Sequence, residues 1–255
     1  MLQGRVALVT GGARGIGKAI AERLGRAGCR VVVADKDLVL SRATAQQIDS
    51  AIAIQMDVSC EASVQRGWQE IEEQTGSKVQ ILVANAGLQV ISSLQDLRLD
   101  QWNRVMDVNL TGAFLVARRA MQDMTTAGGG KIIFVGSVHS KTASVMKAPY
   151  VASKHALLGL CRVLAKEGAK HGIHANVVCP GFVKTELVEK QIPEQAKRLG
   201  ISEHEVVKNV MLKDTVDGEF TTVEEVAEVC TFLAGFPSGA LTGQSLIVSH
   251  GWVME

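Results

Sequence analysis

The sequence predicts an α/β fold with one doubly wound parallel sheet, and three observations lead to this prediction. Short runs of aliphatic and β-branched residues alternate with longer helical patterns along the whole chain. The short runs are almost continuously apolar, which is typical of parallel strands buried on both faces. A glycine cluster joins the first run to the first helical pattern. We therefore expect a single Rossmann-like domain over residues 1–255, with helices on both faces of a seven-stranded sheet.

The elements follow in a regular order. Strands are expected at Arg5–Thr10, Arg30–Asp35, Ala51–Met56, Gln80–Ala84, Lys131–Ser137, Ile173–Cys179 and Ser245–Val248. Helices are expected at Gly15–Ala27, Leu38–Ile48, Glu61–Thr75, Asp100–Thr126, Tyr150–His171 and Val223–Ala234. The segment 183–220 has helical patterns but is too long for an ordinary connection. Because it follows the end of a strand, we expect a helical substrate lid, with a surface excursion as the alternative.

The composition excludes several classes of partner. The chain has 27 Lys and Arg against 26 Asp and Glu, which gives no reason to expect nucleic acid or an anionic membrane. The five cysteines are scattered and form no CxxC or Cys/His cluster, so we expect reduced thiols and no metal site. The sequence shows no signal-peptide pattern and no membrane-length apolar stretch, so we expect a cytoplasmic protein. Tyr150 is the single tyrosine.

The glycine cluster indicates a dinucleotide site. Gly11, Gly15 and Gly17 lie where the first strand leads into the first turn of the first helix. Glycines there allow a tight turn and let a pyrophosphate approach the amide groups at the helix N-terminus. Asp35 ends the second strand, where a carboxylate can accept hydrogen bonds from a ribose diol and repel a 2′-phosphate. Arg14 and Lys36 are cations beside this position, and they favour a 2′-phosphate instead. We expect NAD as the cofactor, with NADP as the alternative.

A second pattern indicates acid–base chemistry. Tyr150 and Lys154 are four residues apart on a predicted helix and therefore share a face. A phenol with a pKa of about 10 is a poor base, but a nearby ammonium group and an oxidised nicotinamide favour the phenolate and commonly lower such a pKa by about 1–3 units. Ser137 ends the fifth predicted strand and can hydrogen-bond a substrate oxygen. We expect Tyr150 to be the general base.

These motifs together resemble the classical short-chain dehydrogenase/reductase family over nearly the whole chain. The resemblance rests on the TGxxxGxG turn, Asp57-Val58, Asn85-Ala86-Gly87, Asn109, Ser137 and the YxxxK pair. It implies that Asp57 and Val58 contact the adenine, and that Asn109 holds a water linking Lys154 to solvent. It also implies that the remaining cofactor contacts include Arg14, Ile16, Asn85, Ala86, Gly87, Tyr150, Lys154, Pro180, Gly181, Val183 and Thr185.

Further polar residues lie in or beside segments that should surround the nicotinamide. They are Gln89, His139, Lys147, Gln191 and Trp252. Gln, His and Lys supply donors and a cation, which suits a small carboxylate. The strings AGLQ, SVHSKTASVMKAPYVASKH, CPGFVKTELVEKQI and HGW resemble soluble bacterial D-3-hydroxybutyrate dehydrogenases, a subgroup of that family. This implies that Gln89, His139, Lys147 and Gln191 bind the carboxylate and that Trp252 closes the pocket, where Ser137 and Tyr150 also contact substrate.

The implied reaction is the NAD-dependent oxidation of (R)-3-hydroxybutanoate to acetoacetate. A reductase of 3-oxoacyl thioesters, a sugar or polyol dehydrogenase, and a non-catalytic NAD-binding sensor or scaffold are the alternatives. Each proposed substrate residue, taken singly, also has a purely structural explanation. The resemblance further implies a homotetramer formed through the helices Asp100–Thr126 and Tyr150–His171 together with a C-terminal contact.

Overall fold

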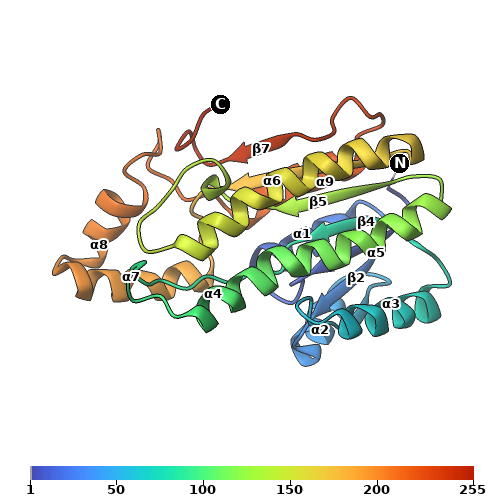
Figure 1. Cartoon of the computed structure of the whole chain (residues 1–255), viewed down its shortest axis with the longest axis horizontal. Coiled ribbons are helices and arrows are strands. Elements are labelled where there is room, and N and C mark those ends of the chain that lie inside the picture. The colour runs from blue at the N-terminus through green and yellow to red at the C-terminus, as the bar shows by residue number, and fades with distance from the viewer. Residues whose placement is uncertain (1) are drawn as a thin grey trace.

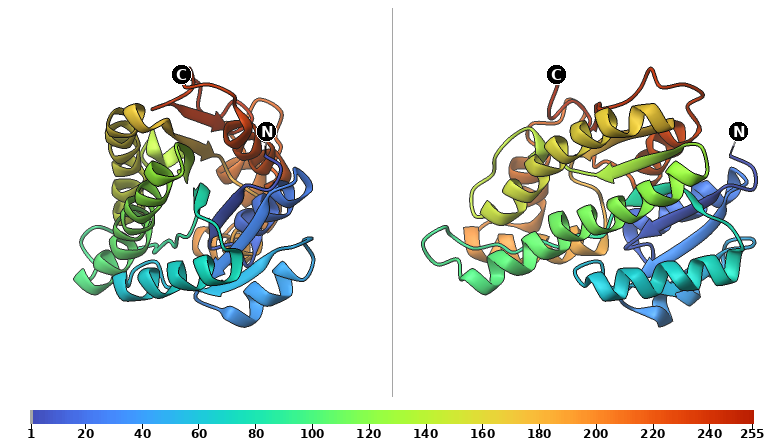
Figure 2. Two further views of the ribbon diagram at one scale, coloured as in Figure 1. Left: turned by 90° about the vertical axis from the view of Figure 1, so that its right-hand side faces the viewer. Right: turned by 45° about the vertical axis from the view of Figure 1, so that its right-hand side comes forward.

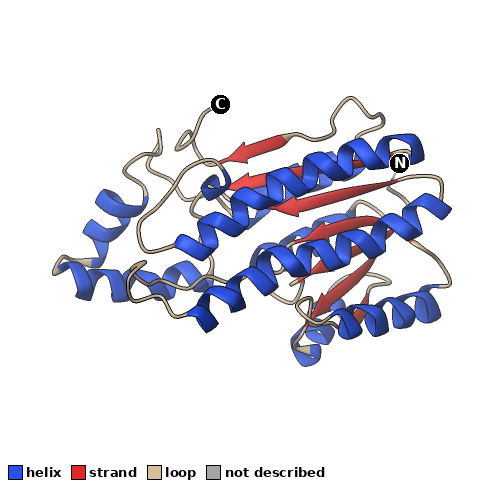
Figure 3. Cartoon of the chain, viewed as in Figure 1, coloured by secondary structure: helices blue, strands red, loops and turns tan. Residues whose placement is uncertain are grey.

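A computed structural model describes residues 2–255, without the side chains of residues 186, 187 and 190. Its sheet has seven strands in the order β3-β2-β1-β4-β5-β6-β7, and all pairings are parallel (Figures 1 and 3). The strands are β1 (Val6–Thr10), β2 (Arg30–Asp35), β3 (Ile52–Gln55), β4 (Val79–Ala84), β5 (Gly130–Val135), β6 (Ile173–Pro180) and β7 (Ser245–Val248). The predicted fold class and all seven predicted strands are confirmed.

Helices cover both faces of the sheet (Figure 2). Alternate residues of β1 divide between two cores: Val6 and Leu8 pack on one side, and Ala7 and Val9 on the other. The first core is closed by α3 (Glu61–Thr75), α5 (Gly112–Thr126) and α6 (Ala148–Gly168). The second is closed by α1 (Gly15–Arg26), α2 (Leu38–Ala45) and α9 (Val223–Gly235). Burial on both faces explains why the strand sequences are continuously apolar.

The helix predicted at Asp100–Thr126 is not regular. It consists of α4 (Leu99–Met106), a π-helical turn at Asp107–Thr111, and α5. Buried Asn109 lies in this turn, and its amide bonds both backbone groups of Leu88. The side chain thus fixes the loop after β4, a tertiary contact that sequence periodicity does not reveal. At the end of α6, a 3₁₀ turn at Ala169–His171 completes the predicted helix.

The segment 183–220 forms its own helical layer at the carboxyl ends of the strands (Figure 1). It contains α7 (Glu186–Leu199), α8 (Glu203–Val206) and a π-helical turn at Val207–Met211. Val206, Met211 and Leu212 are buried in a small apolar cluster, against which Phe182 packs. The predicted helical excursion is therefore present, and its opening and closing remain a prediction.

Both ends of this excursion meet beside the sheet. Val183 and Thr221 form a parallel bridge. The backbone N–H of Thr221 donates to the Phe182 carbonyl at 3.0 Å, and its carbonyl accepts from the Lys184 N–H at 3.1 Å. The Thr221 hydroxyl donates to the Val248 carbonyl at the end of β7, at 3.2 Å. The start and the end of the excursion are thus tied to each other and to the sheet. Within residues 2–255, no helix is both long and apolar enough to cross a membrane.

Candidate active site

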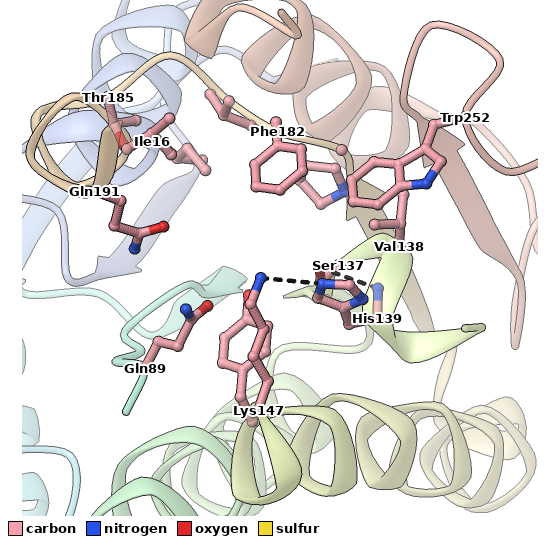
Figure 4. A pocket seen from close by; sticks show the side chains of 16 residues that line it. Ile16, Gln89, Ser137, Val138, His139, Lys147, Phe182, Thr185, Gln191 and Trp252 are labelled. Atoms are coloured by element: carbon pink, nitrogen blue, oxygen red, sulfur yellow. Dashed lines mark hydrogen bonds between the residues drawn. The ribbon is translucent and has the colours of Figure 1, made fainter. Parts of the chain in front are cut away.

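A cleft lies at the carboxyl ends of the strands (Figure 4). Its lining includes all the predicted substrate residues, which are Gln89, Ser137, His139, Lys147, Tyr150, Gln191 and Trp252. It also includes the predicted cofactor residues Ile16, Pro180, Gly181, Val183 and Thr185. Parallel strands place their carboxyl ends at one edge of the sheet, so loops far apart in sequence meet there. The structure therefore brings the predicted substrate group together.

Tyr150 and Lys154 lie in the first two turns of α6, which begins with Pro149 in its first turn. The Lys154 Nζ atom is 5.6 Å from the centroid of the Tyr150 ring. The same ammonium donates to the Val135 carbonyl at the end of β5, at 2.7 Å. Burial lowers the pKa of Lys154 to about 8. The lysine is thus held beneath the tyrosine by the backbone of the strand that leads to Ser137.

The protein's own groups raise the pKa of Tyr150 above its usual value. Burial of the phenol is the main cause, and the hydrogen bond from Ser137 opposes it. Lys154 was expected to lower the pKa of Tyr150, but the residues of the chain alone do not produce this lowering. The physical reason is that loss of hydration destabilises the phenolate more than the neighbouring serine stabilises it. Among the groups of the chain, burial therefore has the larger effect on the pKa of the phenol.

Asn109 lies one layer behind the cleft. Its Oδ1 accepts from the Leu88 N–H at 2.8 Å, and its Nδ2 donates to the Leu88 carbonyl at 3.0 Å and to Ser153 Oγ at 3.2 Å. A Cβ atom added to Gly87 would lie 3.4 Å from Asn109 Oδ1 and 3.7 Å from Lys154 Nζ. Asn109 and Lys154 thus flank the same glycine. The proposed water-mediated relay between them remains a prediction.

Lys147 and His139 form the polar centre of the cleft. Lys147 Nζ lies 3.4 Å from His139 Nε2, and burial lowers the pKa of the lysine. The pKa of His139 is lowered to about 4, mainly by burial and then by the charge of Lys147, against a raising effect of the Thr142 backbone. The imidazole is therefore neutral near pH 7, and because Lys147 can only donate, Nε2 accepts and Nδ1 carries the hydrogen.

Two buried polar atoms at the cleft have no hydrogen-bond partner among the groups that the structure describes. They are Gln89 Nε2 and His139 Nδ1. Leaving a buried donor unpaired costs about 1–3 kcal/mol, so such atoms at a cleft indicate a bound polar ligand. In Figure 4 the side chains of Gln89, Lys147 and Gln191 converge on one side of the cavity. A cation and two amides suit a carboxylate group.

Aromatic rings form the opposite wall (Figure 4). Phe182 and Trp252 are stacked, with ring centroids 4.8 Å apart and an interplanar angle of 3°. Trp252 also meets His139 edge-on at 5.7 Å, and Lys147 Nζ lies 5.4 Å from the Phe182 centroid. The sequence reasoning missed Phe182. Its signal was available, because it directly follows Pro180-Gly181 at the end of a predicted strand.

The glycine turn has the shape that a pyrophosphate needs. Gly11 and Gly15 have positive φ values of 62° and 54°. A Cβ atom on Gly11 would lie 2.9 Å from Ala86 Cα, and one on Gly17 would lie 2.1 Å from the Gly11 carbonyl oxygen. Exposed Arg14 precedes α1 without a side-chain cap for its first amide groups. These amides are thus left for an anion, and the turn suits a dinucleotide.

The remaining predicted cofactor residues follow neighbouring strands. Asp35 ends β2, and its Oδ1 accepts from the Asp37 N–H at 3.2 Å. Among the described residues, no ion pair within 4.0 Å joins Asp35 to Arg14 or Lys36. The Asp35 carboxylate is thus free of ion pairs with these two cations. This is the arrangement in which it can accept hydrogen bonds from a ribose.

The residues expected at the adenine and beneath the nicotinamide lie outside the cleft lining. Asp57, after β3, accepts from the Ser59 hydroxyl at 2.6 Å. Val58 is buried against Gly112. Asn85, after β4, donates through Nδ2 to the carbonyls of Thr10 and Gly11 at 3.0 and 3.1 Å. Asn85 therefore supports the glycine turn from below.

Replacing Gly17 with alanine tests this packing. The added Cβ would overlap the Gly11 carbonyl oxygen and lie 2.5 Å from Asn85 Nδ2, so the glycine turn must open. We expect a loss of unfolding free energy of about 1–3 kcal/mol, together with weaker NADH binding. Gly235→Ala at the end of α9 is the matched control, because the added Cβ would meet only the Leu2 side chain, at an ordinary 3.5 Å. It should leave NADH binding unchanged and the unfolding free energy nearly so. Thermal melts and NADH fluorescence titrations measure both, and equal behaviour of the two variants would contradict the packing argument.

No metal centre is apparent in the described part of the chain, since no three His, Cys, Asp or Glu side chains gather to hold an ion. The five cysteines are free thiols, and four of them are buried. Burial raises the pKa of the Cys161 and Cys230 thiols to about 12. They therefore stay protonated near pH 7, and the chemistry of the cleft rests on oxygen and nitrogen groups.

Comparison with known proteins places this site in a family. The family model described as short chain dehydrogenase matches residues 5–196. A D-beta-hydroxybutyrate dehydrogenase of Rhizobium meliloti is 35% identical over 98% of this chain and 99% of the relative. A 3-oxoacyl-[acyl-carrier-protein] reductase of Aquifex aeolicus is 33% identical over 98% of each chain. The crystal structure of a proposed gluconate dehydrogenase from Agrobacterium tumefaciens superposes with a TM-score of 0.89 at 34% identity, over 98% of this chain and 96% of that one. The chain thus belongs to the short-chain dehydrogenase family of oxidoreductases, as its motifs predicted.

Proposed function

We propose that the protein oxidises (R)-3-hydroxybutanoate to acetoacetate, with NAD as the hydride acceptor, in a reversible reaction. The observation that carries this proposal is the Lys147 ammonium, with the Gln89 and Gln191 amides, in the same cleft as Tyr150. A carboxylate bound there places a secondary alcohol a few bonds away near the phenol. The name of the Rhizobium meliloti relative supports the same substrate.

Tyr150 acts as the general base. In the oxidation its phenolate takes the proton of the substrate hydroxyl, while the hydride leaves the carbon that bears this hydroxyl. The products are acetoacetate, NADH and one proton. The bound cofactor supplies the hydride acceptor and a positive ring charge, which offsets the burial that raises the pKa of the phenol. Ser137 hydrogen-bonds the reacting oxygen. Lys154 supports the phenolate electrostatically, and Asn109 orders the proton path behind it.

The carboxylate is recognised by charge and by neutral donors. Lys147 provides the cation, and neutral His139 accepts from it through Nε2 and so orients the ammonium toward the carboxylate. Gln89 and Gln191 provide amide donors, and that of Gln89 has no partner among the described side chains and backbone groups. The stacked Phe182 and Trp252 rings close the far side. This wall limits the chain length that the cleft accommodates.

The adenosine end of the cofactor is selected by Asp35. Its carboxylate accepts hydrogen bonds from an unmodified ribose and repels a 2′-phosphate, so NAD is preferred over NADP. We expect Asp57 and Val58 to contact the adenine, and the loop from Asn85 to Gly87 to support the nicotinamide half. Residues 1–255 then act as one catalytic domain, with 183–220 as the lid.

We further propose a homotetramer built on the outer faces of α5 and α6. Phe114 on α5 and Val163 on α6 are 41% and 51% exposed, although both are apolar. Exposed apolar side chains on long helices favour burial against another copy. Light scattering coupled to size-exclusion chromatography tests this directly. A monomeric mass at micromolar concentration would contradict it.

A substrate panel tests the proposed activity. NADH formation is followed by absorbance with the D and L isomers of 3-hydroxybutyrate, with longer 3-hydroxy acids, and with glycerol, sorbitol and gluconate. We expect the highest kcat/KM with the D isomer of 3-hydroxybutyrate and NAD. A preference for NADPH with acetoacetyl thioesters would favour the 3-oxoacyl reductase, which the Aquifex aeolicus relative represents. Binding of NADH without turnover of any substrate would favour a sensor or scaffold.

A further inference from the structure

His250, outside the catalytic group, joins two segments of the chain through its side chain. It follows β7 and adopts a left-handed backbone conformation, with φ of 50°. Its Nδ1 lies 2.6 Å from Asp217 Oδ2, and its Nε2 lies 3.2 Å from Glu225 Oε2. An imidazole that meets a carboxylate at each nitrogen donates at both only when it is protonated. The ring therefore links the end of the excursion to the start of α9 as a cation.

The backbone around His250 makes contacts with the same segment. The His250 carbonyl accepts from the Val216 N–H at 2.9 Å. Gly251 lies so close to Val216 that an added Cβ atom would be 2.7 Å from Val216 Cγ1. Asp217 and Glu225 lie on either side of Thr221, which pairs with the backbone of Phe182. His250 thus holds the chain four residues before and four residues after Thr221, whose backbone pairs with that of Phe182.

This junction leads to the aromatic wall by two routes. Trp252 is two residues beyond His250, and the backbone N–H of Trp252 donates to the Ser249 carbonyl at 3.0 Å. Phe182 is reached through Thr221, and the two rings stack on each other at 4.8 Å. Both members of the wall are therefore attached to His250, one along the chain and one across hydrogen bonds. A change at His250 has a direct structural path to the cleft.

The charges that face the ring are both negative. Among the described residues these are the carboxylates of Asp217 and Glu225. Hydrogen bonds to Asp217 and then Glu225 raise the pKa of His250 above its usual value, and the pKa of each carboxyl group is lowered. His250 is thus protonated in the folded protein below about pH 6.5 and at somewhat higher pH. It loses its charge as pH rises through the raised pKa.

We propose that protonated His250 is a positioning residue, which holds the stacked Phe182 and Trp252 wall closed against the substrate and releases it on losing its proton. The inference rests on the proposed function only in that this wall borders the substrate. The link itself belongs to the protein alone. It can therefore be tested without any substrate.

Tryptophan fluorescence provides the first test. The chain has three tryptophans, Trp68, Trp102 and Trp252, and the difference between the wild type and Trp252→Phe isolates the signal of Trp252. We expect that signal to change with pH, with a midpoint above 6.5. In His250→Gly, where glycine suits the positive φ, the transition should vanish and the high-pH signal should persist throughout. Loss of the Trp252 transition in the wild type, or its survival in His250→Gly, would overturn the proposal.

Partner variants separate charge from packing. Asp217→Asn should move the midpoint toward 6.5, because it removes the carboxylate bonded to Nδ1. Asp214→Asn is the matched control, since Asp214 is exposed in the same segment and its ion-pair partner among the described residues is the adjacent Lys213, at 3.9 Å. It should leave the midpoint unchanged. Equal midpoints in the two variants would contradict an electrostatic link.

Kinetics provide an independent readout. Below the midpoint, His250→Gly should raise KM for the substrate about two- to fivefold with little change in kcat. The effect is modest because the ion pair of His250 with Asp217 is partly exposed to solvent. Above the midpoint, the wild type and the variant should converge. His250→Asn keeps a residue that tolerates positive φ without the charge, and it should behave as His250→Gly does. If no substrate is turned over, the proposed function fails, while the fluorescence result still decides this inference.

Discussion

Tyr150→Phe is expected to lower kcat for alcohol oxidation by about 10²- to 10⁴-fold, the usual contribution of a general base. The substitution keeps the ring and removes only the phenolic oxygen, so the Ser137 hydroxyl loses its partner while the packing of α6 is retained. NADH binding should therefore change little. Stopped-flow absorbance for turnover and fluorescence titration for NADH separate the two effects. Near-wild-type turnover in a variant that binds NADH normally would contradict the role of Tyr150.

The same residue permits a direct spectroscopic measurement. Because Tyr150 is the only tyrosine, the phenolate absorbance of the native protein reports this one group, and Tyr150→Phe provides the blank. Burial raises the pKa of the phenol in the protein, so we expect a midpoint above about 10 for the chain alone. With NAD bound, the midpoint should fall below about 10, and the rate of oxidation should rise with pH through it. A midpoint at or above 10 in the NAD complex would contradict activation by the cofactor charge.

Lys147→Gln should lower kcat/KM for D-3-hydroxybutyrate by about 10- to 100-fold, because it removes the cation that pairs with the substrate carboxylate in a partly buried site. The neutral methyl ester of the same substrate provides the decisive comparison. It cannot form the ion pair, so its kcat/KM should be nearly equal in wild type and variant. Lys208 is an exposed lysine of the excursion, and Lys208→Gln is the control. It should leave kcat/KM unchanged for both the acid and the ester.

The pH dependence of KM follows from the same lysine. Burial lowers the pKa of Lys147 below its usual value of about 10.5, so its charge is lost as pH rises through that lowered pKa. At pH values above the His250 transition, we expect KM for the acid to rise further with pH, and KM for the ester to stay flat. An equal loss with acid and ester in Lys147→Gln would show that the lysine shapes the cleft rather than pairing with a carboxylate.

Much of the fold could be predicted because its signals are local. Strands buried on both faces must be continuously apolar, and the glycine turn must lie between the first strand and the first helix. The order of those strands places Ser137, Tyr150 and Pro180 at one edge of the sheet, which is why the substrate group was predicted together. Spacing on a single helix was enough to pair Tyr150 with Lys154.

What could not be predicted depends on contacts between distant segments. Phe182 and Trp252 are far apart in sequence, and their stacking depends on how 183–220 returns to the sheet. The direction of the Tyr150 pKa depends on burial, which a motif does not encode. The link from His250 to Asp217 likewise requires the end of β7 to lie beside the end of the excursion. Local patterns fix elements, whereas the balance of burial and charge arises only in the assembled molecule.

The π-helical turn at Asp107–Thr111 has a consequence for which changes in length this chain can tolerate. An extra residue in a helical turn disturbs the regular hydrogen bonding of the helix, so deleting one residue there would restore an ordinary α-helix. That deletion would rotate Asn109 by about 100° about the helix axis and break its bonds to Leu88. The loop after β4 would then lose its attachment to the helix beside α6. The irregular turn therefore positions Asn109 at the expense of regular helical hydrogen bonding.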